Sequence, residues 1–128
     1  MSSEVIKKFN EAVDELLQYE TGDQLRDRLI ADGITGVPGE CHACPVAVWL
    51  IRQLHVEPQL ISVDQESCQL WSRYDREWSL ERERTTPWSV RQFINTFDGL
   101  ACDLEPSDYV DNDKLRSYLP ILRREVTE

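Results

Sequence analysis

The chain has 128 residues, of which 24 are acidic and 14 basic, so its formal net charge is -10 with neutral histidines. This length matches one domain, and a hydrophobic content of 41% with four tryptophans argues against a disordered chain. The charge disfavours direct binding to nucleic acid or to an anionic membrane, because both would repel it. No apolar run approaches the roughly 18–20 residues of a membrane span, and no secretory signal is visible. We therefore expect a single compact domain over residues 1–128, located in the cytoplasm.

Two helices and a loop are predicted in the first third of the chain. Apolar residues recur at helical spacing over 3–19, from Ile6 to Leu17, which predicts an amphipathic helix. Thr21 and Gln24 have the spacing of a capping box and predict a second, shorter helix that stops at Gly33. Residues 33–40 contain three of the five glycines and must form a loop.

A third, apolar helix follows this loop. Pro45 suits the first helical position, because the backbone N–H that proline lacks would be unpaired there anyway. Residues 46–51 are apolar on every face of a helix. We expect this helix at the centre of the core.

The middle of the chain predicts a small antiparallel meander with one packed face and one face in water. A short strand is expected around 60–63, and a second over 68–74, where Cys68 and Leu70 alternate with Gln69 and Trp71. Residues 75 and 76 can turn the chain. Trp78, Leu80 and Arg82 then alternate with charged or small residues in a third strand.

The last third of the chain predicts two more helices. Thr86 and Pro87 open the first, which Gly99 closes, and the second covers roughly 112–126, where Pro120 should kink or split it. The predicted fold class is therefore α+β, with about five helices packed around a small antiparallel two- to three-stranded sheet.

A resemblance supports this layout. The chain resembles a loose group of small uncharacterised actinobacterial and actinophage proteins over about residues 33–104. The group has no assigned activity, so the resemblance implies a layout and a host rather than a chemistry. The chain departs from the group where Gly99 directly follows Asp98, and its acidic tail is its own. The resemblance rests on Cys44-Pro45-Val46-Ala47 at the start of the apolar helix, on Pro87, Val90 and Phe93, and on Phe97, Asp98 and Leu100.

The four cysteines are expected as thiols or metal ligands rather than disulfides. Cys41 and Cys44 form a C-x-x-C pair, which lets two sulfurs face one zinc ion. Cys68 and Cys102 could complete a four-sulfur site only if the second strand and the end of the fourth helix converge on the loop. A redox role is a further possibility, because the N-terminal end of a helix lowers the pKa of a thiol such as Cys44. The plainer interpretation is that Cys44, Cys68 and Cys102 fill the core.

Catalysis gains little support, since only two histidines and no nucleophile-elbow motif are present. We therefore expect no catalytic residue and no cofactor, with zinc as the alternative. Trp71, Trp78 and Trp88 could anchor a partner, but tryptophans in a small domain more often fill the core, so we expect packing.

The segment 103–113 has five acidic residues and no basic one. Solubility explains such a charge, and a negative surface for a protein partner explains it too, including a basic partner that normally binds nucleic acid. We expect a small acidic interaction protein without catalysis, the alternative being a metal-binding or thiol-redox module that uses Cys41 and Cys44. The expected partner-binding residues are Asp103, Glu105, Asp108, Asp111 and Asp113.

Overall fold

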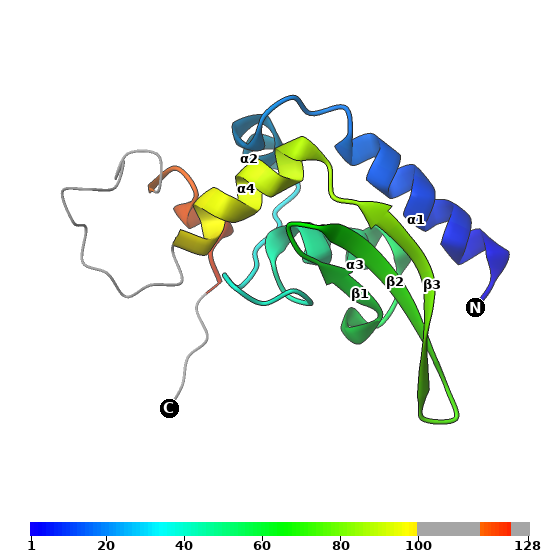
Figure 1. Ribbon diagram of the computed structural model, residues 1–128. Coiled ribbons are helices and arrows are strands. Elements are labelled where there is room, and N and C mark those ends of the chain that lie inside the picture. Colours follow the sequence, from blue (N-terminus) through cyan, green and yellow to red (C-terminus); the bar gives the residue numbers. More distant parts are fainter. Residues whose placement is uncertain (100–115, 124–128) are drawn as a thin grey trace, which may run out of the picture.

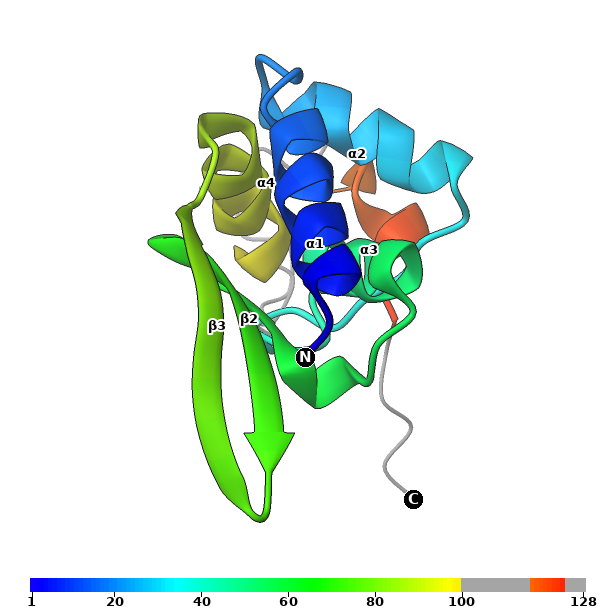
Figure 2. The same cartoon turned by 90° about the vertical axis from the view of Figure 1, so that its right-hand side faces the viewer.

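The computed structural model describes residues 1–99 and 116–123, and it has the predicted α+β architecture. Two of the four α-helices contact one face of a three-stranded antiparallel sheet, the other two lie beyond one end of the sheet, and the opposite face has no helix of these residues over it (Figures 1 and 2). The helices are α1 (Ser3–Leu16), α2 (Gly22–Ala31), α3 (Pro45–Leu54) and α4 (Trp88–Asp98). The strands are β1 (Ile61–Val63), β2 (Ser67–Tyr74) and β3 (Glu77–Thr85), in the order β1-β2-β3.

The expected fifth helix over 112–126 lies partly outside the described residues. Within 116–123 the chain forms a short 3-10 helix, η3 (Leu119–Ile121), and then an extended residue, Leu122, so no continuous helix runs through this part. Pro120 lies inside η3, where its missing N–H and fixed φ are compatible with one turn but not with a helix that continues through it.

The helix starts follow the predicted capping chemistry. The Thr21 hydroxyl accepts from the Gln24 N–H at 3.2 Å, and the Gln24 side-chain oxygen accepts from the Glu20 N–H at 2.8 Å. In a standard capping box the Gln24 side chain would accept from the N–H of the cap residue, Thr21, whereas here it accepts from the N–H of the preceding residue, Glu20. The first helix ends three residues before the predicted position, and Leu17 is 57% exposed rather than part of the buried stripe.

The core is built around α3, which contacts α1, α2 and β1. Val46, Ala47 and Leu50 have no exposed surface, in agreement with the predicted central position of this helix. Burying one Leu, Val or Phe side chain contributes roughly 1.5–3 kcal/mol. The other fully buried side chains come from α1, α2, α4, two strands and the segment 116–123: Phe9, Leu29, Ile61, Cys68, Leu70, Val90, Phe93, Tyr118 and Ile121.

Strands β2 and β3 form a long hairpin that extends beyond the helices (Figure 2). Its two-residue turn is Asp75-Arg76, both with positive φ (49° and 69°), the backbone twist that two-residue hairpin turns favour. The pairing shifts between Leu70 and Trp71, where β3 carries one extra residue, Glu81. This shift is a β-bulge.

The segment 116–123 packs back onto the loop before α3. Tyr118 and Ile121 are fully buried, and the Tyr118 ring lies 5.4 Å from the Phe93 ring. The Gly36 N–H donates to the Ile121 carbonyl at 2.9 Å, and the Gly36 carbonyl accepts from the Arg123 N–H at 2.7 Å. A Cβ on Gly36 would come within 2.4 Å of the Pro45 nitrogen and 2.6 Å of the Ala43 oxygen.

We expect Gly36→Ala to lower the free energy of unfolding by about 3 kcal/mol, the upper end of the cost of overpacking, because the added Cβ meets backbone atoms that cannot move aside. The control is Gly39→Ala, which meets no atom within 4 Å and should cost only about 1 kcal/mol for its left-handed φ. Urea unfolding compares the two variants. Equal losses in both would mean that the close approach at Gly36 is not what the fold requires.

Candidate protein-binding site

The β-bulge decides which side chains share the face of the sheet that no described helix covers. Before the bulge Leu70 lies opposite Arg82, and after it Trp71 lies opposite Leu80. Leu70 is buried on the helix side, so its neighbour Trp71 belongs to the opposite, outer face. Leu80 therefore shares the outer face with Trp71. In a strand without a bulge, Leu80 would lie on the same face as Arg82, two residues away.

The apolar side chains of the hairpin reverse their direction at this point. Near the body of the protein Cys68 and Leu70 are buried, whereas farther out the large apolar residues are exposed: Leu80 by 45% and Trp78 by 46%. Trp78 lies opposite Arg73, also on the outer face. Apolar residues that gather on one exposed face favour a role in binding.

Core packing, which we expected for three tryptophans, is wrong for all three. Trp71 is partly buried, Trp78 is 46% exposed and Trp88 is 63% exposed at the start of α4. All four tryptophans lie within the described residues, and Trp49 on α3 is the one that is buried.

A groove of about 360 Å³ crosses the outer face between β3 and the loop before α3. Its lining is formed by His42, Gln59, Ser62, Gln69, Trp71 and Trp78. We call this lining the aromatic groove. Its volume lies within the range of small-ligand or side-chain sites.

Hydrogen bonds fix the polar residues of the aromatic groove. The Trp71 Nε1–H donates to Gln69 Oε1 at 3.1 Å, and Gln69 Nε2–H donates to a carboxylate oxygen of Glu83 at 2.7 Å. Gln59 Nε2–H donates to Glu57 at 2.8 Å. His42 Nδ1 lies 2.6 Å from the Ile61 carbonyl oxygen, which can only accept, so this ring nitrogen carries the proton. Side chains fixed in this way lose less freedom when a ligand binds.

One tryptophan of the groove already holds a cation. The Arg73 guanidinium carbon lies 5.4 Å from the centre of the Trp78 ring. This is the distance of a cation–π contact, in which the negative face of the ring attracts the positive charge.

The cysteine loop has a different character. Cys41 is exposed, whereas Cys44 and Cys68 are buried, and Cys102 lies outside the described residues. Cys44 caps α3, since its Sγ accepts from the Ala47 N–H at 3.4 Å. Within 1–99 and 116–123, no three His, Cys, Asp or Glu side chains gather where they could hold a metal ion.

Cys44 is buried in the core, and the lowered pKa on which the redox possibility depends is not found. Burial raises the pKa of the Cys44 thiol to about 12, against the smaller lowering effect of the N–H groups of α3. Burial likewise raises the pKa of Cys68 to about 11. A thiol that acts as a nucleophile or a metal ligand must lose its proton, and the burial of Cys44 opposes that loss.

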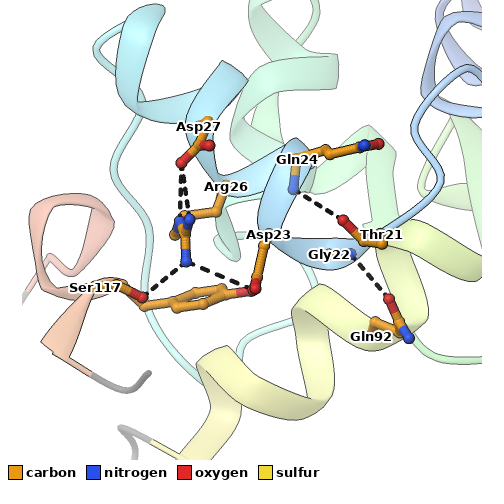
Figure 3. Close-up of polar contacts among 9 residues, drawn as sticks. Thr21, Gly22, Asp23, Gln24, Arg26, Asp27, Gln92 and Ser117 are labelled. Carbon is orange, nitrogen blue, oxygen red and sulfur yellow. Dashed lines mark hydrogen bonds and ion pairs between the residues drawn. The ribbon is translucent and has the colours of Figure 1, made fainter. Parts of the chain in front are cut away.

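A polar cluster at the start of α2 holds the segment 116–118 in place (Figure 3). Arg26 donates to Ser117 Oγ at 2.8 Å and forms ion pairs with Asp23 at 3.5 Å and Asp27 at 3.0 Å. The Tyr118 hydroxyl donates to Asp23 at 2.8 Å, and Arg26 also lies over the Tyr118 ring. Burial and the bond to Asp23 raise the pKa of Tyr118. We interpret the cluster as a structural anchor, because its charged groups pair with one another.

The acidic residues of the first 40 positions do not form an unpaired row. Seven of the nine pair with Lys7, Lys8, Arg26, Arg28 or Arg84. Surface pairs of this kind contribute about 0–1 kcal/mol each, but they neutralise charge locally. The paired acids are Glu4, Glu11, Asp14, Glu15, Asp23, Asp27 and Asp32. The predicted partner-binding residues Asp103, Glu105, Asp108, Asp111 and Asp113 lie outside the described residues.

Comparisons of the chain with protein-family models, with curated proteins and with solved structures found no match. The resemblance to the actinobacterial and actinophage group therefore stays a prediction. None of the helices in 1–99 and 116–123 is long and apolar enough to cross a membrane.

We expect iodoacetamide to modify Cys41 roughly a hundredfold faster than Cys44 or Cys68 in the native protein, because the two buried thiols are protonated and shielded. Peptide mass mapping at intervals measures each rate. In urea the three thiols should react alike, which controls for reagent access. Equal rates at Cys41 and Cys44 in the native protein, or protection of both that a chelator removes, would contradict this assignment.

We expect Cys44→Ser to change how stability depends on pH. The folded-state pKa of about 12 lies above the ordinary 9.0, so the thiol's contribution is complete below pH 9.0 and is lost as the pH rises toward 12. The loss is at most about 1.4 kcal/mol per pH unit. The variant lacks this thiol, so only the wild type loses its contribution as the pH rises. The difference between their free energies of unfolding, measured in urea, should therefore decrease above pH 9.0. Cys68 is present in both proteins and cancels, and a constant difference would contradict the prediction.

Proposed function

We propose that the protein is a small, acidic, non-catalytic interaction protein of the cytoplasm that binds another protein through the outer face of its sheet. The observation that carries this proposal is that the bulge in β3 places Trp78 and Leu80 on the outer face, where the alternation of β2 already places Trp71. These residues are exposed or partly buried, and they lie together on one face.

The chemistry of this face supports protein binding. Tryptophan is enriched among the residues that contribute most to protein interfaces, because its large ring buries much apolar area at little cost in side-chain entropy. The aromatic groove offers such rings beside amide groups that hydrogen bonds already hold in position. A partner therefore gains apolar contact and polar contact at the same place.

The charge of the chain supports a partner with a basic surface. A net charge of -10 attracts a basic protein over a distance and speeds the encounter, although it does not by itself define the contact. The acids of the first 40 positions are mostly paired, so we assign this steering to the charge of the whole chain. The run Asp103, Glu105, Asp108, Asp111 and Asp113 is a proposed contributor to it.

No observation on the described residues favours the alternative of a metal-binding or thiol-redox module. Cys44 serves as the cap of α3, and its thiol is buried and held in the protonated form. Native mass spectrometry of protein purified without chelator tests the alternative directly, because one bound zinc ion adds a defined mass.

We expect Trp78→Ala and Trp71→Ala to weaken partner binding at least about tenfold, the usual effect of truncating a central aromatic residue of an interface. Partners cross-linked to the wild-type chain in a lysate are identified first and then titrated as purified proteins against each variant. The matched control is Trp88→Ala, which removes an even more exposed tryptophan from α4 and should leave the affinity unchanged. Trp78→Ala and Trp88→Ala should retain wild-type stability to within about 0.5 kcal/mol, because these two side chains are exposed.

Either of two results would overturn the proposal. One is a purified partner that binds Trp71→Ala, Trp78→Ala and the wild type equally well. The other is a partner that Trp88→Ala loses and Trp78→Ala keeps, which would move the binding face to α4.

A further inference from the structure

We propose that the aromatic groove receives an arginine side chain of the basic partner. This inference rests on the proposed function and deepens it by naming the group that the groove recognises.

The aromatic walls suit a planar cation. Trp71 and Trp78 both line the groove, and indole has the most favourable ring for a cation–π contact. Arg73 shows this chemistry within the molecule, since its guanidinium already lies over Trp78 at 5.4 Å. A ring has two faces, so a contact with Arg73 leaves room for a second cation on the other face.

The polar groups at the groove carry the complementary charge. Gln69 and Gln59, which line the groove, donate to Glu83 and Glu57, so two carboxylates lie one hydrogen bond away from the lining. Each carboxylate has more lone pairs than the one amide bond uses, so it can accept further N–H groups. The charge of these two carboxylates agrees in sign with the net charge of -10. An anionic ligand would be repelled both by these carboxylates and by the net charge of the chain.

Arginine fits these groups better than lysine. A guanidinium is flat, stacks on an indole ring, is weakly hydrated and presents five N–H donors in one plane. An ammonium is compact and holds its water tightly, so it gains less in a groove lined by rings and amides.

A second copy of the chain is the less favoured occupant. The outermost strand, β3, carries the alternating charges Glu81, Arg82, Glu83 and Arg84. Two-fold antiparallel pairing about Arg82 would place Arg82 against Arg82 and Glu81 against Glu83. Like charges directly opposite one another destabilise a sheet and protect an edge strand from self-pairing.

The test titrates the full ¹⁵N-labelled chain with acetyl-Gly-Arg-Gly-amide and follows the indole Nε1–H signals by NMR. We expect the signals of Trp71 and Trp78 to shift and saturate, while those of buried Trp49 and of Trp88 on α4 stay in place. The matched ligand is the same peptide with citrulline, which keeps the shape of arginine and lacks its charge. Citrulline should bind roughly 5- to 30-fold more weakly, the factor that a cation–π contact supplies.

Variants test the assignment from the side of the protein. Trp71→Ala and Trp78→Ala should each lower the affinity for the arginine peptide by roughly 5- to 30-fold, and Trp88→Ala should leave it unchanged. Arg73→Gln should strengthen binding, because it removes a like charge and frees the ring face that Arg73 now covers. A purely apolar groove would show no gain from Arg73→Gln.

Three results would overturn the inference: equal binding of the citrulline peptide, shifts confined to Trp88, or indole shifts that follow protein concentration without peptide and so reveal a second copy. Partner binding that still depends on Trp78 would then preserve the proposed function while this inference fails. If Trp71→Ala and Trp78→Ala bind the partner as tightly as the wild type does, the proposed function fails, whether or not the arginine peptide binds.

Discussion

The burial of α3 is the constraint on which the rest of the structure depends. A ten-residue helix that begins with Pro-Val-Ala-Val-Trp-Leu-Ile must be covered on several sides, and α1, α2 and β1 supply that cover. Its N-terminus needs an acceptor, yet the site is too buried for a charge. A neutral thiol meets both demands, which explains why Cys44 caps the helix with its proton retained. The same packing explains Gly36, because the loop before the helix passes too close for a side chain.

Only part of the β2–β3 hairpin packs against the core. The half of the hairpin nearest α3 buries Cys68 and Leu70, whereas the outer half extends past the helices, where no core remains to be covered (Figure 2). A regular strand would have continued the same alternation and turned Leu80 toward the helix side, with Leu70. The extra residue Glu81 instead places Leu80 opposite Trp71. Bulges are common where a protein redirects side chains for function, and this one gathers the aromatic residues on the free face.

Local signals predicted the fold well and the site poorly. The capping residues Thr21 and Cys44 act over three residues, and so do proline at a helix start and the turn at Asp75-Arg76, so a sequence shows them directly. The bulge has no such signature. The apolar and polar residues of β3 still alternate in the sequence, and the extra residue is apparent only from the pairing of β3 with β2. The pKa of Cys44 was missed for a related reason. The helix N-terminus that lowers it is local, but the burial that raises it comes from residues distant in the sequence.

Charge and shape have separate roles in this molecule. The acids of α1 and α2 are tied to neighbouring bases, and the β2–β3 hairpin balances its own charges, with four acids and four arginines between residues 73 and 84. In the proposed function, the net charge of -10 acts on the partner as a field of the whole chain and raises the rate of encounter. The affinity for that partner would come from a place where apolar area, fixed hydrogen bonds and nearby carboxylates coincide. Among the described residues the aromatic groove combines these features, because the alternation of β2 places Trp71 on the outer face, the bulge places Trp78 there, and Glu57 and Glu83 hold its amides.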